Sequence, residues 1–138
     1  MRSIGKYGEY RVLACLLERD TEAYQANNIN QNDFDLTVVL HSERIVRVQV
    51  KSTDLYNKAT NNAIDRIDKQ YDFLVVVIFV GHGKARFFVM SKEEAMQLKG
   101  PNKQLGVTQI RAKVPEVKTA LLPYEDQWGK ITEPQMQW

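Results

Sequence analysis

Residues 34–51 read FDLTVVLHSERIVRVQVK, and this stretch decides the fold. Apolar and polar side chains alternate in residues 34–40 and again in residues 45–51, which is the period of a strand with one buried face. The intervening HSER is polar and predicts a turn. The stretch therefore predicts a β-hairpin.

The register of this hairpin gathers three polar side chains. Directly paired residues of an antiparallel hairpin share a face, and a slip of one residue moves every valine to the wrong side. If Phe34 and Val50 face the same core, Asp35 must lie across from Gln49 or from Lys51. We therefore expect a carboxylate, an amide and an amine on one patch of the sheet.

These groups suit the hydrolysis of a phosphodiester bond. Asp35 can bind a divalent cation, Mg²⁺ or Mn²⁺, while the Gln49 side-chain oxygen and the Val50 backbone carbonyl can add neutral oxygen ligands. Such an ion stabilises the charge that develops on phosphorus. Lys51 can orient or deprotonate the attacking water, or neutralise the transition state. The alternation alone is equally compatible with a strand cap at Asp35 and an ordinary solvated face at Gln49 and Lys51.

The segments on either side of the hairpin predict an α/β protein. Upstream, residues 3–18 have apolar positions at helical spacing, and Glu9 on this helix could hold a metal-bound water or a second ion. The other elements expected are a short strand at residues 23–24, a loop at 25–33, a thin helical face at 57–68, a strand buried on both faces at 73–80, a strand at 85–90 that pairs back, a helix with a capping box from Ser91 to about Lys99, a short strand at 107–110 and a short helix at 115–121. Together they predict a mixed sheet flanked by helices.

Length and composition limit the class of protein. The chain has 138 residues, close to the size of one domain, and 19 basic against 17 acidic residues, a balance that neither demands nor excludes a polyanionic partner. The single Cys15 excludes an internal disulfide, and the separated His41 and His82 do not suit a zinc site. The longest apolar run is far shorter than the ~20 residues of a membrane span. We expect a soluble, cytoplasmic protein without membrane association.

The order of the motifs resembles the core of the PD-(D/E)xK nucleases. The likeness is carried by Gly8-Glu9, by Asn32-Asp33-Phe34-Asp35-Leu36, by Arg47-Val48-Gln49-Val50-Lys51-Ser52-Thr53, and by the strands that follow. It spans about residues 5–98 of a single nuclease domain, residues 1–138, and leaves residues 101–138, with Trp128 and Trp138, for packing or oligomer contacts. Within the superfamily the chain is most similar to small single-domain endonucleases of the intron-homing type, some of which also have glutamine in place of the second acid.

The resemblance implies a restriction-endonuclease-like α/β fold and a role for each motif residue. Asp35 would be the metal-binding aspartate, and Gln49 stands at the usual acidic ligand position. Lys51 would be the catalytic lysine, and Glu9 the helix-borne glutamate. Gln49 departs from the family pattern, and a neutral ligand lowers the negative charge of the site by one.

The implied activity is magnesium-dependent cleavage of double-stranded DNA. Cutting both strands is simplest with two sites, so we expect a homodimer or homotetramer. Candidate contacts to the nucleic-acid backbone are Lys6, Arg47, Ser52, Thr53 and Lys58, each of which alone also fits an ordinary surface group. Two rivals stay open: a catalytically degenerate nucleic-acid-binding module on the same fold, and an assembly protein. Homing, restriction and repair are not distinguished.

Overall fold

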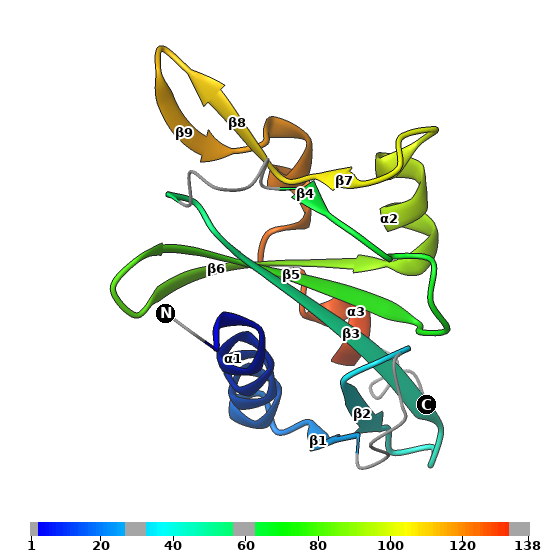
Figure 1. Ribbon diagram of the computed structural model, residues 1–138. Coiled ribbons are helices and arrows are strands. Elements are labelled where there is room, and N and C mark those ends of the chain that lie inside the picture. The colour runs from blue at the N-terminus through cyan, green and yellow to red at the C-terminus, as the bar shows by residue number, and fades with distance from the viewer. Residues whose placement is uncertain (1–2, 27–32, 57–62, 133–138) are drawn as a thin grey trace.

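A five-stranded mixed sheet forms the centre of the computed structural model, which describes residues 3–26, 33–56 and 63–132 (Figure 1). The strands lie in the order β1 (Glu22–Gln25), β2 (Leu36–Val39), β3 (Ile45–Asp54), β5 (Phe73–Gly81) and β6 (Lys84–Ser91). β3 and β5 run parallel, and the other neighbouring pairs are antiparallel. The predicted hairpin is thus β2 with β3, and the predicted mixed sheet is confirmed.

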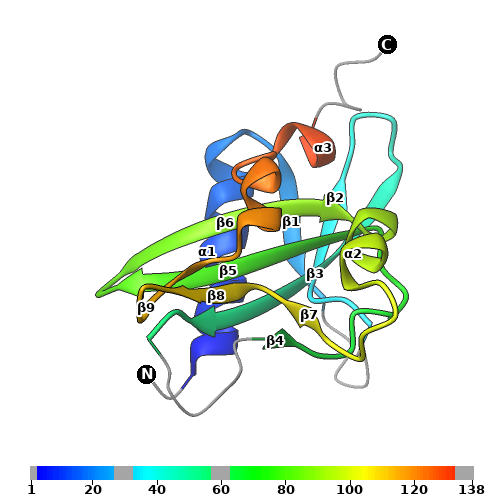
Figure 2. The ribbon, with the colours of Figure 1, turned by 90° about the horizontal axis from the view of Figure 1, so that it is seen from above.

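Helices cover both faces of this sheet (Figures 1 and 2). On one face lie α1 (Ile4–Glu18) and the short α3 (Gly129–Thr132). On the other lie α2 (Lys92–Lys99), β4 (Ala63–Ile64), β7 (Leu105–Gly106) and the 3₁₀ helix η1 (Thr119–Tyr124). A hairpin of β8 (Thr108–Arg111) and β9 (Val114–Val117) projects from this second face. None of the helices in the described ranges is long and apolar enough to cross a membrane.

The central strand β5 divides the apolar interior into two cores. Val75 and Val77 face α1, whereas Val76 and Ile78 face the opposite side, and all four are fully buried. Burial of an aliphatic side chain of this kind contributes about 1.5–3 kcal/mol. The prediction of a strand buried on both faces is confirmed, and the two cores together fix β3 beside β5.

Two of the expected helices are wrong where the structure describes them. Residues 63–68 contain the strand β4 and no helix. The helix was predicted because Ile64 and Ile67, which are both buried, are three residues apart, as on one face of a helix. Residues 57–62 lie outside the described residues. The helix expected at 115–121 is replaced by β9 and by η1, which starts at Thr119. Pro115 is tolerated because β9 belongs to a two-stranded ribbon with open edges.

The C-terminal segment packs along the outer edge of β6. Glu125 forms a bridge with Phe88, and the Asp126 N–H donates to the Phe87 carbonyl at 2.9 Å. The Arg86 guanidinium donates twice to the Glu125 carboxylate, each time at 2.7 Å. Trp128 is only 3% exposed and contacts the Phe87 ring. Trp128 is therefore a core residue, while Trp138 lies outside the described residues.

Helix α1 crosses β3 at Gly8, where the two backbones approach closely. A Cβ at Gly8 would lie 1.9 Å from the Ser52 Oγ and 3.1 Å from its Cβ. The Ser52 Oγ is itself buried and has no hydrogen-bond partner among the described residues. Glycine is therefore required at this position by a side-chain contact, and the contact sets how far α1 sits above the sheet.

We predict that Gly8→Ala destabilises the protein although alanine is the better helix former. Overpacking costs about 1–3 kcal/mol, which exceeds the gain of roughly 1 kcal/mol from helix propensity. Gly5→Ala is the control, because nothing lies within 4 Å of a Cβ there and only the gain remains. Urea denaturation should rank Gly5→Ala above wild type and Gly8→Ala below it. Equal stabilities of the two variants would contradict the close approach.

Candidate active site

The candidate site lies where β2 ends beside β3. The ladder between the two strands runs from Val39 with Ile45 to Leu36 with Val48, and the Asp35 N–H still donates to the Val48 carbonyl at 2.8 Å. Beyond this point β3 continues beside β5 without β2. The Val50 N–H, the next group that β2 would have paired, donates instead to Oδ2 of Asp35 at 2.7 Å. The Asp35 side chain thus accepts the hydrogen bond that the backbone of β2 would otherwise have accepted.

Gln49 completes a compact polar cluster with Asp35. Its Nε2 donates to the same Oδ2 of Asp35 at 3.1 Å, and the residue is only 6% exposed. Its Oε1 is buried without a hydrogen-bond partner among the described residues. Burying an amide oxygen without a hydrogen-bond donor costs about 1–3 kcal/mol of folding free energy. Of the two expected neighbours of Asp35 across the hairpin, Gln49 or Lys51, the structure has Gln49.

The premise that led to this expectation was wrong at Phe34. The Phe34 ring packs near the Arg47 guanidinium and against the core under α2, whereas Val50 belongs to the core under α1. β2 begins only at Leu36, so the alternation of its faces does not extend back to Phe34. The pairing of Leu36 with Val48 is sufficient to bring Asp35 to Gln49.

The oxygen atoms at this edge fit a divalent cation of the magnesium class. Because the N–H and C=O of one strand residue point to the same side, the Val50 carbonyl faces the open edge with its N–H. Together with Asp35, and with the Gln49 Oε1 once its amide has turned over, this carbonyl would make a set of oxygen ligands. No three His, Cys, Asp or Glu side chains gather anywhere in the described ranges. A site with few carboxylates suits Mg²⁺, which keeps several waters and takes further ligands from substrate phosphates.

Helix α1 brings Glu9 to the same edge. Burial raises the pKa of the Glu9 carboxyl, and the negative charge of Asp35 raises it further. Lys6 opposes both effects, with its Nζ 3.7 Å from the Glu9 Oε2. Burial also raises the pKa of Asp35, against the hydrogen bond from Val50 and the charges of Lys51 and Lys6. Two partly buried carboxylates therefore act on each other, an arrangement that a bound cation would relieve.

Lys51 lies half-buried on β3, two residues beyond Gln49. Burial lowers the pKa of its ammonium group, and the negative charges of Asp35 and Asp65 raise it again in part. Lys51 lines a cleft of about 320 Å³ together with Ile4 of α1, Thr53 and Asp65. The amine is thus less firmly protonated than an exposed lysine and borders an open cleft.

The five candidate nucleic-acid contacts occupy different environments. Lys6 pairs with Glu9, and Arg47 is engaged with Asp72 through a 3.5 Å contact. The Ser52 hydroxyl is buried under Gly8 without a hydrogen-bond partner among the described residues, while the residue also lines the cleft beside Lys51. Thr53 lines the cleft beside Lys51. Lys58 lies outside the described residues.

Sequence reasoning missed Asp65 and Arg66, which lie close enough to act on the charge of Lys51. They belong to the run Asp65-Arg66-Ile67-Asp68-Lys69, whose charges alternate without a motif. Their proximity to β3 depends on the pairing of β4 with β7, which is far away in the sequence. The one feature of the sequence that could have indicated Asp65 and Arg66 is their position next to Ile67, an apolar residue that is buried in the structure.

Comparison with solved structures identifies the fold. The chain is similar to a bacterial homing endonuclease, I-Ssp6803I, with a TM-score of 0.67 and 14% sequence identity over 99% of this chain and 95% of that one. No family model and no curated protein sequence matches the chain. The predicted α/β class, a mixed central sheet flanked by helices, is confirmed by this likeness.

We predict that Asp35→Asn stabilises the protein when no divalent ion is present. The pKa of Asp35 is raised in the folded state, so the fold favours the protonated carboxyl and loses stability as the pH rises through that range. At neutral pH the amide removes this penalty, while below the ordinary carboxyl range the two proteins should converge. Thermal unfolding at several pH values measures the difference. Glu18→Gln removes one negative charge from the exposed end of α1 and should show no such gain.

Wild type and the two variants should respond differently to Mn²⁺. At ten times its dissociation constant an ion bound only to the folded state adds about 1.4 kcal/mol of stability. We expect this gain for wild type and for Glu18→Gln, and not for Asp35→Asn. An equal gain in Asp35→Asn would place the ion elsewhere.

Proposed function

We propose that this protein is a metal-dependent endonuclease of the PD-(D/E)xK type that hydrolyses phosphodiester bonds in double-stranded DNA in the cytoplasm. The observation that carries the proposal is the cluster of Asp35, Gln49 and Lys51 at the open edge of β3, with an unpartnered Gln49 oxygen inside it. The likeness in fold to a homing endonuclease supports a nuclease, and intron homing is the first biological role to test.

The oxygens of this cluster have a defined task in the proposed reaction. Asp35, the Gln49 Oε1 and the Val50 carbonyl would hold Mg²⁺, or Mn²⁺ in its place, and Glu9 would act through a water molecule. The ion, when bound, supplies Lewis-acid stabilisation of the charge that develops on the phosphate. The Gln49 amide now donates to Asp35, and a half-turn about its last side-chain bond would present Oε1 to the open edge instead.

Lys51 supplies the chemistry that the carboxylates lack. Its lowered pKa increases the fraction of neutral amine, which can accept a proton from the attacking water. In its charged form the same group neutralises the negative charge of the transition state. Both roles need the amine beside the scissile phosphate, and the cleft that Lys51 lines provides room for that phosphate.

Replacing Lys51 by alanine tests the proposed function. We expect cleavage of duplex DNA with Mg²⁺ to fall by about two to four decades, with DNA affinity nearly unchanged because the lost contact belongs to the transition state. Lys84→Ala removes the same charge from the exposed first residue of β6 and should cleave like wild type. Cleavage and binding are measured for each protein on the same labelled duplex. Undiminished cleavage by Lys51→Ala would remove Lys51 from the mechanism, and a wild type that binds DNA but never cleaves would favour the degenerate binding module.

The proposed cleavage of both strands implies that two copies act together. One chain contains one such site among the described residues, and a symmetric pair would place one site on each strand. We predict a homodimer or homotetramer, measured as mass by light scattering at micromolar concentration with and without duplex DNA. A mass equal to one chain under both conditions would contradict the prediction.

A further inference from the structure

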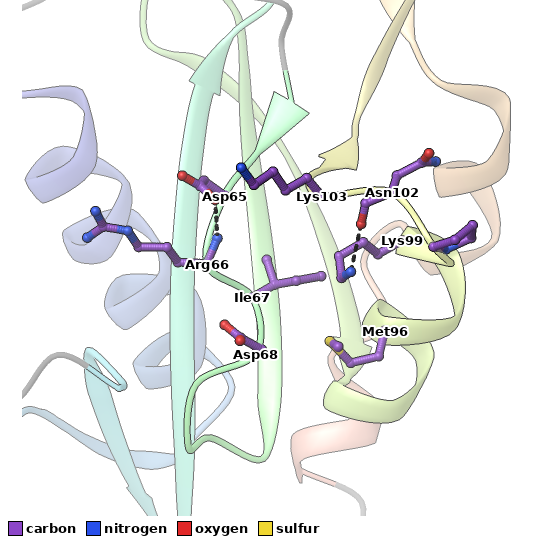
Figure 3. A pocket seen from close by; sticks show the side chains of 9 residues that line it. Asp65, Arg66, Ile67, Asp68, Met96, Lys99, Asn102 and Lys103 are labelled. Carbon is purple, nitrogen blue, oxygen red and sulfur yellow. Dashed lines mark hydrogen bonds between the residues drawn. The ribbon is translucent and has the colours of Figure 1, made fainter.

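Residues 65–68 lie between two adjoining clefts, one beside the end of β3 and one beside the end of α2. The first, about 320 Å³, contains Lys51 and ends at Asp65. The second, about 510 Å³, begins at Asp65 and is bounded by Lys99 and Lys103 near the end of α2 (Figure 3). Because Asp65 lines both, the hollow surface continues from the proposed catalytic lysine toward the C-terminal end of α2.

Arg66 is held at this junction by its backbone. Its φ of 57° lies in the left-handed region, which is unfavourable for a side chain as large as arginine. The Asp65 Oδ1 accepts from the Arg66 N–H at 2.9 Å, and the next residue, Ile67, is only 2% exposed. A local hydrogen bond on one side and a buried anchor on the other thus impose the strained conformation, as is common at functional sites.

The side chain of Arg66 lines the second cleft and extends from it toward β3. Figure 3 shows its side chain leading away from Lys99 and Lys103 and across the ribbon of β3. It is exposed and forms no ion pair with any described residue, although Asp65 and Asp68 are close in sequence. Its neighbour Asp65 also lines the cleft that contains Lys51, so the two cations border one continuous hollow surface. A group of opposite charge bound between Arg66 and Lys51 would satisfy both.

We propose that Arg66 binds a backbone phosphate next to the scissile one and that the paired clefts carry the cleaved strand. Guanidinium groups bind phosphate through two parallel hydrogen bonds, which fix orientation as well as position. The strained backbone then serves to aim the group before the nucleic acid arrives. This inference rests on the proposed nuclease function, and it assigns the substrate-binding surface that the motif residues alone leave open.

The test measures duplex binding by fluorescence anisotropy in Ca²⁺ without turnover, with a labelled random-sequence DNA. Arg66→Ala should weaken binding roughly tenfold, equally for all sequences, and should lower the salt slope of the affinity by about one between about 50 and 200 mM salt. Arg66→Gly should do the same although it relieves the strained backbone, which separates lost binding from lost stability. Arg66→Lys should recover part of the affinity.

Arg44→Ala is the matched control. It removes the same exposed charge from the turn before β3, about 23 Å along the strand from Lys51. In cleavage assays Arg66→Ala should raise KM more than it lowers kcat. Equal weakening by Arg44→Ala, or unchanged affinity and salt slope in Arg66→Ala, would overturn the inference. Absence of any DNA binding by wild type would instead overturn the proposed function itself.

Discussion

The hydrogen bond from the Val50 N–H to the Asp35 carboxylate is the contact on which the rest of this structure depends. This hydrogen bond, 2.7 Å long, replaces the strand pairing that ends where β2 leaves β3, and it holds the carboxylate at the edge of the sheet. The same oxygen receives the Gln49 amide. A single backbone donor therefore ends the strand, satisfies the free edge and positions the group on which the proposed chemistry is centred.

Placing the Asp35 carboxylate at this partly buried edge has an electrostatic cost, which is seen in the pKa values of the neighbouring groups. Asp35 and Glu9 are both harder to ionise than free carboxyls, chiefly through burial, and Lys51 is harder to protonate for the same reason. In each case burial disfavours the charged form of the group, and a neighbouring group of opposite charge reduces the pKa shift. Having glutamine at position 49 avoids a third carboxylate in this confined space. The site is thus less self-repelling, and it relies more on waters and substrate oxygens to complete a cation's shell.

The sequence was informative where a period of two persisted and failed where short apolar spacings were ambiguous. The alternation in residues 34–51 was sufficient to predict β2, β3 and the meeting of Asp35 with Gln49, although Phe34 turned toward the other core. The spacing of Val117 and Leu121 imitated a helix because a strand and a 3₁₀ turn buried them in succession. Arg66 was beyond reach, because residues 65–69 carry no motif and only the fold shows that they lie between the two clefts.

The cover over the edge of β6 has a consequence for how the chain is made. Phe87, Phe88, Val89 and Met90 are all buried in the finished protein, and the contacts of Glu125 and Asp126 with this strand come from almost forty residues later. During synthesis the sheet therefore has to wait, with an apolar strand unpaired on its outer side, until those residues leave the ribosome. An unpaired edge of this kind invites pairing with another nascent chain. Chaperone demand and the yield of soluble protein should accordingly depend on when Glu125 and Asp126 emerge.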